Sequence, residues 1–388
     1  MLWAVKCVNQ PRKETSMKTL CIALLASISI ASLQAKDGLK TIEIVPSKIE
    51  TGDLKLSNLI TSIEYIPLET TDECLIGNIG SYDISEKYIL VYCRQGKTLA
   101  LFDRKGKFLR TISRHGQGPE EFISIKGLKL DEQKNLIIIN DIVGIKFFDL
   151  QGKFLRTSTL HTGPDFQLQI DESRLFSCFP GSVKGDSVYP IYRLFDISGK
   201  QGLFIRGAVQ SVPLDTKVKA GEVAYIGIPS MISQYRYKGQ VCMKDNAMND
   251  TLYTFGADYR VVPKCIITAG KLAYTKEMKS DYNLFLREQA NHLGFYSLYE
   301  TDLYYLLAYL YRQQIKYCFV DKRDGAVKHF NSSKGIPNDY NGGFDFSFHF
   351  DVRQDNNVWT TFYNAELFAE RKDLSNIKPV GPKAAVDR

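Results

Sequence analysis

The chain has 388 residues, of which 44% are hydrophobic and 24% charged, and its formal net charge is +7. This composition is ordinary for a globular protein, and the length allows several domains or one large all-β domain. Its basic residues form no Lys/Arg-rich run, which argues against a nucleic-acid-binding surface. Aromatic residues reach 12%, which favours strands because large flat side chains pack well on a pleated surface.

Residues 17–35 are predicted to be an export signal. Met17 and Lys18 give a short positive start, and residues 20–33 are apolar or small without a charge. Small residues close the run, with Ala35 as one cleavage point, which is the order of a secretory signal peptide. The run is shorter than the roughly 20 residues of a spanning helix, so cleavage is favoured over a membrane anchor.

Residues 1–16 lie ahead of this signal, either because Met17 is the true start or because the signal has a long first region. We expect residues 1–35 to be removed and residues 36–372 to form one domain without a transmembrane segment. Residues 373–388 are expected to be a flexible tail. The mature chain is expected to be periplasmic or secreted.

Six cysteines remain after the signal, and none forms a CxxC pair, so the sequence gives no support for a zinc cluster. Most lie singly within apolar runs, and although export permits disulfides, we expect buried free thiols. The six are Cys74, Cys93, Cys178, Cys242, Cys265 and Cys318.

Internal repeats dominate the chain from about residue 88 onward. Phe-Asp pairs begin at Phe102, Phe148 and Phe195, at separations of 46 and 47 residues. A period in the forties is typical of a four-stranded propeller blade. Each pair ends an apolar run and opens a tight turn, in which Asp caps its own backbone and Gly takes a positive φ. A strand follows each of the first two turns, which predicts hairpins.

Further strands are predicted upstream of each hairpin and in three later units. The predicted ranges are 88–93, 136–140, 175–179, 250–255, 317–325, 351–357 and 358–362. Insertions lengthen the fourth and fifth units at about 212–232 and 275–291. The second has helical spacing at Met278, Tyr282, Phe285 and Leu286.

Leu293 to Ile315 is interpreted as two strands around residues 300–302, although a helix over 302–314 is an alternative. Ile42–Val45 and Ile63–Leu68 could complete the last blade, since ring closure usually mixes strands from both chain ends. The predicted fold is therefore an all-β, six-bladed propeller of four-stranded antiparallel blades with one short helical insertion.

Several motifs resemble the six-bladed β-propeller proteins of gut Bacteroidota, which are related in shape to NHL-repeat and TolB-like propellers. The motifs are Tyr65-Ile66-Pro67-Leu68-Glu69-Thr70, Leu75-Ile76-Gly77, Phe102-Asp103, Gly106-Lys107-Phe108 and Gly116-Gln117-Gly118-Pro119-Glu120-Glu121-Phe122. The resemblance is strong over about 60–160 and implies an exported envelope protein without assigned catalytic residues. Many relatives carry a lipoprotein cysteine after the signal. Here Cys21 stands at the start of the apolar run and not after it, so a free state is expected.

The connections between blades give the candidate site. In a propeller they gather on one face, and three of them share Gly, Pro, a carboxylate and an aromatic residue. These features are explained by turn geometry alone, or by a polar ring around a ligand. The candidate ligand-binding residues are His115, Gln117, Glu120, Glu121, His161, Asp165 and Asp339.

The function predicted from these features is a ligand-binding or protein-interaction module for a glycan, a peptide or an envelope protein. The alternative is a metal-dependent hydrolase or lyase of the lactonase type, with a site at the channel mouth. Ca²⁺ suits carboxylates and Asn, but no spacing specifies it, so no cofactor, metal ligand or catalytic residue is assigned. A monomer that binds no nucleic acid, and a binding role rather than an enzymatic one, are expected.

Overall fold

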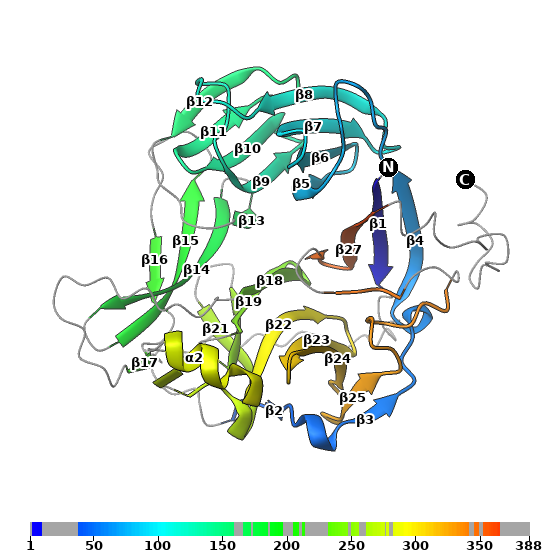
Figure 1. The fold of residues 1–388 in the computed structure, drawn as a ribbon, viewed down its shortest axis with the longest axis vertical. Coiled ribbons are helices and arrows are strands. Elements are labelled where there is room, and N and C mark those ends of the chain that lie inside the picture. Colours follow the sequence, from blue (N-terminus) through cyan, green and yellow to red (C-terminus); the bar gives the residue numbers. More distant parts are fainter. Residues whose placement is uncertain are drawn as a thin grey trace, which may run out of the picture.

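The computed structural model describes most of the chain after residue 37, together with one strand near the N-terminus. The described ranges are 2–9, 38–158, 166–171, 174–184, 187–196, 205–208, 212–213, 232–246, 250–255, 261–275, 277–278, 282–340, 345–348 and 352–364. Within them the fold is all-β, with antiparallel sheets arranged radially around a common centre (Figure 1).

The first sheets follow one another in sequence, and each is a simple up-and-down meander. The first contains β5 (Ile79–Ile84), β6 (Tyr88–Cys93), β7 (Thr98–Asp103) and β8 (Phe108–Arg114). The second contains β9 (Ile125–Asp131), β10 (Leu136–Asp141), β11 (Gly144–Phe148) and β12 (Phe154–Ser158). The third contains β13 (Phe166–Asp171), β14 (Arg174–Lys184), β15 (Ser187–Asp196) and β16 (Ile205–Ala208), with β17 (Val212–Pro213) beside β15.

The later strands form a five-stranded and a nine-stranded sheet. The five-stranded sheet contains β22 (Leu293–Glu300), β23 (Tyr304–Tyr311), β24 (Gln314–Asp321), β25 (Val327–Phe330) and the parallel β3 (Glu50–Gly52). One part of the nine-stranded sheet contains β18 (Ile232–Tyr237), β19 (Gln240–Asp245), β20 (Thr251–Phe255), β21 (Val261–Thr268) and the parallel β2 (Thr41–Glu43). The other contains β26 (Arg353–Asp355), β27 (Val358–Asn364), β1 (Leu2–Asn9) and β4 (Ile60–Pro67). One parallel bridge, between Arg236 and Asp355, joins the two parts.

Helical structure among the described residues is short. It comprises η1 (Pro46–Lys48), η2 (Leu56–Asn58), η3 (Gly270–Leu272), α2 (Tyr282–Glu288) and η4 (Gln289–Asn291). The helical insertion is thus confirmed, with Met278 and Phe285 buried as its spacing predicts. Leu286 was predicted to share that face, but it is 47% exposed. Two strands, β22 and β23, replace the alternative helix over 302–314.

The predicted N-terminal strands take different positions. Ile63–Leu68 corresponds to β4, which joins the β26–β27 group as expected. The prediction for Ile42–Val45 was wrong, since β2 pairs with β21 and buries Ile42 and Ile44 in the core there. In addition β1, which lies ahead of the predicted signal, pairs with both β27 and β4.

The predicted Asp-Gly turns have the expected geometry. Asp103 Oδ1 accepts hydrogen bonds from the backbone N–H groups of Lys105 and Lys107, at 2.8 and 2.9 Å. Gly106 takes a φ of +83°, which a residue with a Cβ adopts only with strain. The same arrangement recurs at Asp149, 46 residues later. The turn after Phe195 lies outside the described residues.

The core lies between neighbouring sheets rather than inside any one of them. Leu90 and Leu101 of the first sheet pack with Leu128 and Ile139 of the second, all fully buried. Strands such as β10 are therefore apolar on both faces. Burying each such side chain contributes about 1.5–3 kcal/mol, so a sheet that lost its neighbour would lose most of its stabilisation.

The meander topology divides each sheet into two ends. The turn between the first two strands lies at one end, and the connection to the next sheet leaves from the other, because successive strands are antiparallel. We call the first end the hairpin end. Neighbouring hairpin ends touch: Glu132 Oε2, in the β9–β10 turn, accepts from the N–H of Lys87 in the β5–β6 turn at 3.0 Å.

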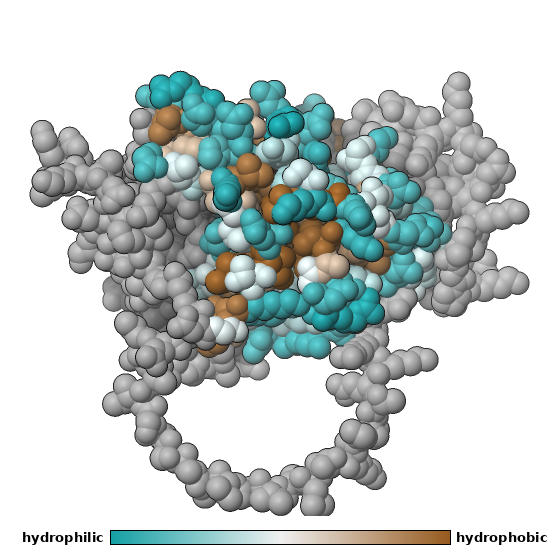
Figure 2. Space-filling model, turned by 90° about the horizontal axis from the view of Figure 1, so that it is seen from below, coloured by the Kyte–Doolittle hydropathy of each residue, from teal (hydrophilic) through white to brown (hydrophobic). Residues whose placement is uncertain are grey.

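The outer side, seen from below in Figure 2, has apolar residues across its middle and hydrophilic residues around them. Exposed large apolar side chains, such as Val262 at 49%, occur on the described surface. Apolar atoms supply over half of an ordinary protein surface, so we assign this mixture no role.

Candidate functional site

The predicted loop after β8, residues 114–122, is closed by its own backbone. The N–H of Gly116 donates to Phe122 O at 3.0 Å, and the N–H of Phe122 donates to Arg114 O at 3.1 Å. Beneath the loop, the buried Lys146 of β11 donates to Pro119 O at 3.0 Å. These contacts fix the path of the chain between two sheets.

The side chains of this loop differ in what they do. Glu121 is half-buried and accepts from the N–H of Gly118 at 2.8 Å. A Cβ at Gly116 would come within 1.9 Å of the Glu121 carboxylate, so the glycine leaves room for it. His115, Gln117 and Glu120 are exposed. The first contacts are those of a turn, and a binding role for the three exposed residues stays a prediction.

The other predicted residues are not drawn into this loop by any contact of the described chain. Asp339 accepts from Ser57, through the backbone N–H at 3.0 Å and the hydroxyl at 2.7 Å. It therefore ties the segment after β25 to η2. His161 and Asp165 lie outside the described residues.

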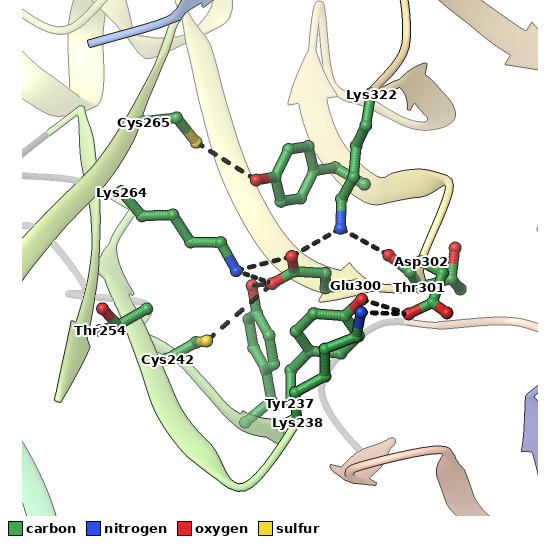
Figure 3. A network of polar contacts seen from close by, with 12 residues as sticks. Tyr237, Lys238, Cys242, Thr254, Lys264, Cys265, Glu300, Thr301, Asp302 and Lys322 are labelled. Carbon is green, nitrogen blue, oxygen red and sulfur yellow. Dashed lines mark hydrogen bonds and ion pairs between the residues drawn. The ribbon is translucent and has the colours of Figure 1, made fainter. Parts of the chain in front are cut away.

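A second polar group lies at the hairpin ends of three neighbouring sheet groups, and we call it the Glu300 network (Figure 3). Glu300, the last residue of β22, is only 1% exposed. Lys264 Nζ of β21 donates to both of its carboxylate oxygens, at 2.6 and 2.7 Å. Lys322 Nζ, just after β24, donates to Glu300 Oε1 at 2.6 Å. One buried carboxylate thus holds two ammonium groups.

Aromatic rings line the same network. The Lys322 ammonium lies 4.8 Å from the Tyr237 ring centroid and 4.6 Å from that of Tyr305, and Lys264 lies 5.0 Å from Tyr237. Such cation–π contacts favour the charged form of each lysine. The hydroxyl of the buried Tyr235 donates to Glu300 Oε2 at 3.0 Å.

The turns around the network hold it in place. Gln354 of β26 accepts from Glu300 N–H at 3.0 Å and donates to Glu300 O at 2.6 Å, so it fixes the backbone that carries the carboxylate. Asp302 accepts from the Tyr237 hydroxyl at 2.5 Å and pairs with Lys238 at 3.2 Å. Three ammonium groups therefore face two carboxylates in this part of the described structure.

Burial changes the titration of this network. Desolvation lowers the pKa of Lys322, and the nearby Lys264 ammonium lowers it further, although Glu300 opposes both. Burial raises the pKa of Tyr237, Tyr305 and Cys242, in the last case to about 12. The lysine side chains remain 25% and 19% exposed at positions 264 and 322, so solvent reaches both.

A smaller cluster joins the innermost strands of three sheets. Asp83 of β5 pairs with Lys129 of β9 at 3.0 Å and with Arg353 of β26 at 3.6 Å. The Arg353 guanidinium also lies 4.5 Å from the Tyr82 ring centroid. Because Arg353 precedes Gln354 on one short strand, the two polar groups contact successive residues of β26.

The structure gives no support for metal binding where it can be tested. Among the described residues, no group of three or more His, Cys, Asp or Glu side chains is placed to hold a metal ion. The three histidines that the structure describes all have partners within the chain, and the His115 ring lies edge-on to that of Phe122, with 6.3 Å between the centroids. His292 Nδ1 lies 2.9 Å from Ala273 O, and His329 stacks on Tyr309.

Sequence reasoning missed the Glu300 network because its members are scattered over 235–354 without a motif. One signal was present: Glu300 and Lys322 each follow an apolar strand, which is where a hairpin end brings turns of neighbouring sheets together. The packing of β18–β21 against β22–β24 around a shared core could not be predicted from the local sequence pattern.

Comparisons with known proteins agree with this fold. The family model described as "Domain of unknown function (DUF4934)" matches residues 39–384. No curated protein matches the chain. No helix among the described residues is long and apolar enough to cross a membrane.

Three solved structures from Bacteroides are similar in shape. A Bacteroides fragilis protein thought to be exported has a TM-score of 0.50 and 18% identity, over 81% of this chain and 86% of that one. A DUF4221 member from Bacteroides vulgatus has a TM-score of 0.45 and 13% identity, over 77% and 95%. A Bacteroides caccae protein of unknown function has a TM-score of 0.36 and 12% identity, over 70% and 90%.

At such identities the first likeness shows the fold alone, and it agrees with the propeller-like arrangement described above. The predicted resemblance to Bacteroidota proteins is thereby supported at the level of the family. Because the family model covers most of its length, the chain belongs to the DUF4934 family, a domain of unknown function.

Proposed function

We propose that this chain is an exported six-bladed propeller that binds a ligand carrying a carboxylate or sulfate group at the Glu300 network. Six blades are supported by the strand order. The nine-stranded sheet divides at one parallel bridge into two groups, and the remaining sheets supply four more. One of the two groups includes β1, which lies ahead of the signal, so after cleavage that group would keep only β26, β27 and β4. Export is supported by the signal-like residues 17–35 and by the likeness to a protein thought to be exported.

The observation that carries the binding proposal is the charge balance of the network. Lys264 and Lys322 share the single carboxylate of Glu300, while Asp302 pairs with Lys238, whose side chain is 64% exposed, so the three lysines exceed the two carboxylates by one. An ammonium group that loses water on burial needs an anionic partner, or its pKa falls. The lowered pKa of Lys322 agrees with such a deficit. A ligand carboxylate or sulfate would remove it.

Partial exposure supports access from solvent. About a quarter of the Lys264 side chain and a fifth of that of Lys322 are exposed, whereas Glu300 is buried behind them. The lysines therefore stand between the buried carboxylate and the solvent. A neutral or cationic group would gain no charge pairing there. No specific contact favours the metal-dependent hydrolase alternative.

Thermal unfolding with matched probes tests this proposal. The probes are a galacturonate trimer, the corresponding neutral galactose trimer, a short Glu-rich peptide and inorganic sulfate. Ligands that bind only the native state raise the melting temperature, so the acidic probes are expected to raise it and the neutral trimer to leave it unchanged. The galacturonate and peptide arms separate a glycan source of the anion from a peptide source.

The variants Lys264→Met and Lys322→Met should abolish the shift. Lys134→Met is the matched control, because Lys134 also belongs to a hairpin end and pairs with Asp131 at 3.6 Å, outside the Glu300 network. An equal shift for all three variants, or a shift with the neutral trimer as large as with the acidic one, would contradict the proposal.

A further inference from the structure

Two buried cysteines from different parts of the first blade touch. Cys93 is the last residue of β6, and Cys74 lies in the segment that leads into β5. Both are 0% exposed and belong to the same core cluster. Both are free thiols in this structure, and each affects the pKa of the other, which places the two side chains next to each other in that cluster.

The backbone on both sides of this pair is held in place. Asn78 O accepts from the N–H of Arg94 at 2.8 Å, one residue beyond Cys93. On the other side, Leu75 O would lie only 3.0 Å from a Cβ at Gly96. Thr71 and Cys74 form a small antiparallel bridge that closes the turn before the cysteine. The two segments therefore run side by side past the thiols.

We propose that Cys74 and Cys93 form a disulfide bond in the exported protein. This inference rests on the export part of the proposed function and is independent of the ligand. Disulfides form and persist in oxidising compartments, whereas two adjacent thiols stay reduced in the cytosol. The bond would close a loop from the segment before β5 to the end of β6, within one blade.

The chemistry is a thiol–disulfide exchange with an oxidised dithiol, such as oxidised glutathione or a disulfide oxidoreductase. The thiolate of one cysteine attacks the oxidant disulfide, which forms a mixed disulfide and releases one thiolate of the oxidant. The second cysteine then attacks the protein sulfur of the mixed disulfide and releases the other half of the oxidant. Two protein thiols lose two electrons and two protons, and the oxidant disulfide becomes two thiols.

Both thiols are fully buried in the folded chain, so the exchange takes place before the blade closes over them. Since the thiolate is the nucleophile, whichever cysteine ionises first makes the first attack, and the other resolves the mixed disulfide.

The other described cysteines have different neighbours. Cys265 donates to the Tyr305 hydroxyl at 3.7 Å, and Cys242 lies 3.9 Å from Glu300 Oε2. Cys318 is buried within the core between two sheets. They provide internal controls for the pair.

Peptide mass spectrometry tests the proposal on the wild-type chain. Protein purified reduced from a cytoplasmic preparation is refolded with a glutathione redox buffer, alkylated and digested with trypsin. Cleavage after Lys55, Lys87 and Arg94 puts Cys74 and Cys93 on separate peptides, 56–87 and 88–94. A linked pair of these peptides, lighter than their sum by two hydrogen atoms, is expected. Alkylation of both cysteines in the refolded protein, or a link to a different cysteine, would overturn the proposal.

Thermal unfolding adds a second readout. The oxidised protein should melt about 5 °C above the reduced protein, because the bond restricts the unfolded chain. Cys74→Ala and Cys93→Ala should lose this difference, whereas Cys318→Ala should retain it. The same digest on protein exported by a Gram-negative host checks the compartment. Retention of the chain in the cytoplasm there would count against export, and free thiols in exported, folded protein would count against the bond.

Discussion

The 114–122 loop and the Glu300 network are both rich in charge, but they differ in what their charges contact. In the loop, His115, Gln117 and Glu120 are exposed. The internal contacts are backbone hydrogen bonds, the Glu121 carboxylate that accepts from the N–H of Gly118, and the His115 ring edge-on to Phe122. In the network, a buried carboxylate holds two lysines from two different sheets. The loop is local in sequence, while the network exists only after the sheets have packed.

This difference separates turn geometry from a built polar site. Glycine, proline and carboxylate residues explain the shape of the loop without a ligand. Turn geometry does not account for the excess positive charge of the network, since no turn requires Lys264 and Lys322 to share Glu300. Substitutions in the two regions should therefore have effects of very different size.

The largest effect is expected from Glu300→Gln, compared with Glu121→Gln. The first substitution leaves two partly buried ammonium groups without their carboxylate, which should lower the free energy of unfolding by about 3–5 kcal/mol. The second weakens one hydrogen bond to Gly118 and should cost about 1 kcal/mol. Urea unfolding measures both, and equal losses would remove the distinction between the regions.

Alkaline pH should weaken the network next. The pKa values of Tyr235, Tyr237 and Tyr305 are raised in the folded chain, mainly by burial, from an ordinary value of 10.0. A raised folded pKa stabilises the protein fully below the unfolded value, and this contribution is lost as the pH rises above about 10. Tyrosinate absorbance should therefore rise together with the loss of circular dichroism. Titration of all tyrosines before unfolding would show that these three are not buried.

Asp339→Ala should have an intermediate effect on stability and none on ligand binding. It removes two hydrogen bonds to Ser57 and releases η2 from the segment after β25. The free energy of unfolding should fall by about 1–2 kcal/mol. Ser57→Ala is the matched partner, and a double-mutant cycle should show coupling between the two positions. Purely additive effects, or a loss of ligand-induced stabilisation, would reject this structural role.

The smallest effect is expected from the double variant His115→Ala, Gln117→Ala. Both side chains are exposed, so the free energy of unfolding should change by less than about 0.5 kcal/mol. If the turn interpretation is correct, affinity for the acidic probes should not change either. Calorimetric unfolding and binding on the same sample check both points.

Much of the fold could be predicted because its signals are local. Phe102 and Phe148 mark a repeat of blade length, and the Asp-Gly turns that follow them have the predicted hydrogen bonds and positive φ values. The paired strands around Glu300-Thr301-Asp302 were also visible as apolar runs. By contrast, β2 pairs with one edge of β21, which lies more than 200 residues away in the sequence. No local sequence pattern specifies such a pairing.

The candidate site was harder to predict than the fold. Gly and Pro made residues 114–122 conspicuous, yet those residue types mark turns before they mark ligands. Lys264 and Lys322 carry no motif, and their common partner is defined only by the packing of one sheet on the next. The useful signal was the number of lysines gathered around the buried Glu300 carboxylate, which can be counted only from coordinates.

The most direct test of the binding claim is isothermal titration calorimetry with the galacturonate trimer on three proteins. These are the wild type, Lys322→Met and the double variant His115→Ala, Gln117→Ala. Binding that is lost in Lys322→Met and kept in the double variant is the predicted result. Binding that survives in Lys322→Met and disappears in the double variant would place the ligand at the 114–122 loop and contradict the account.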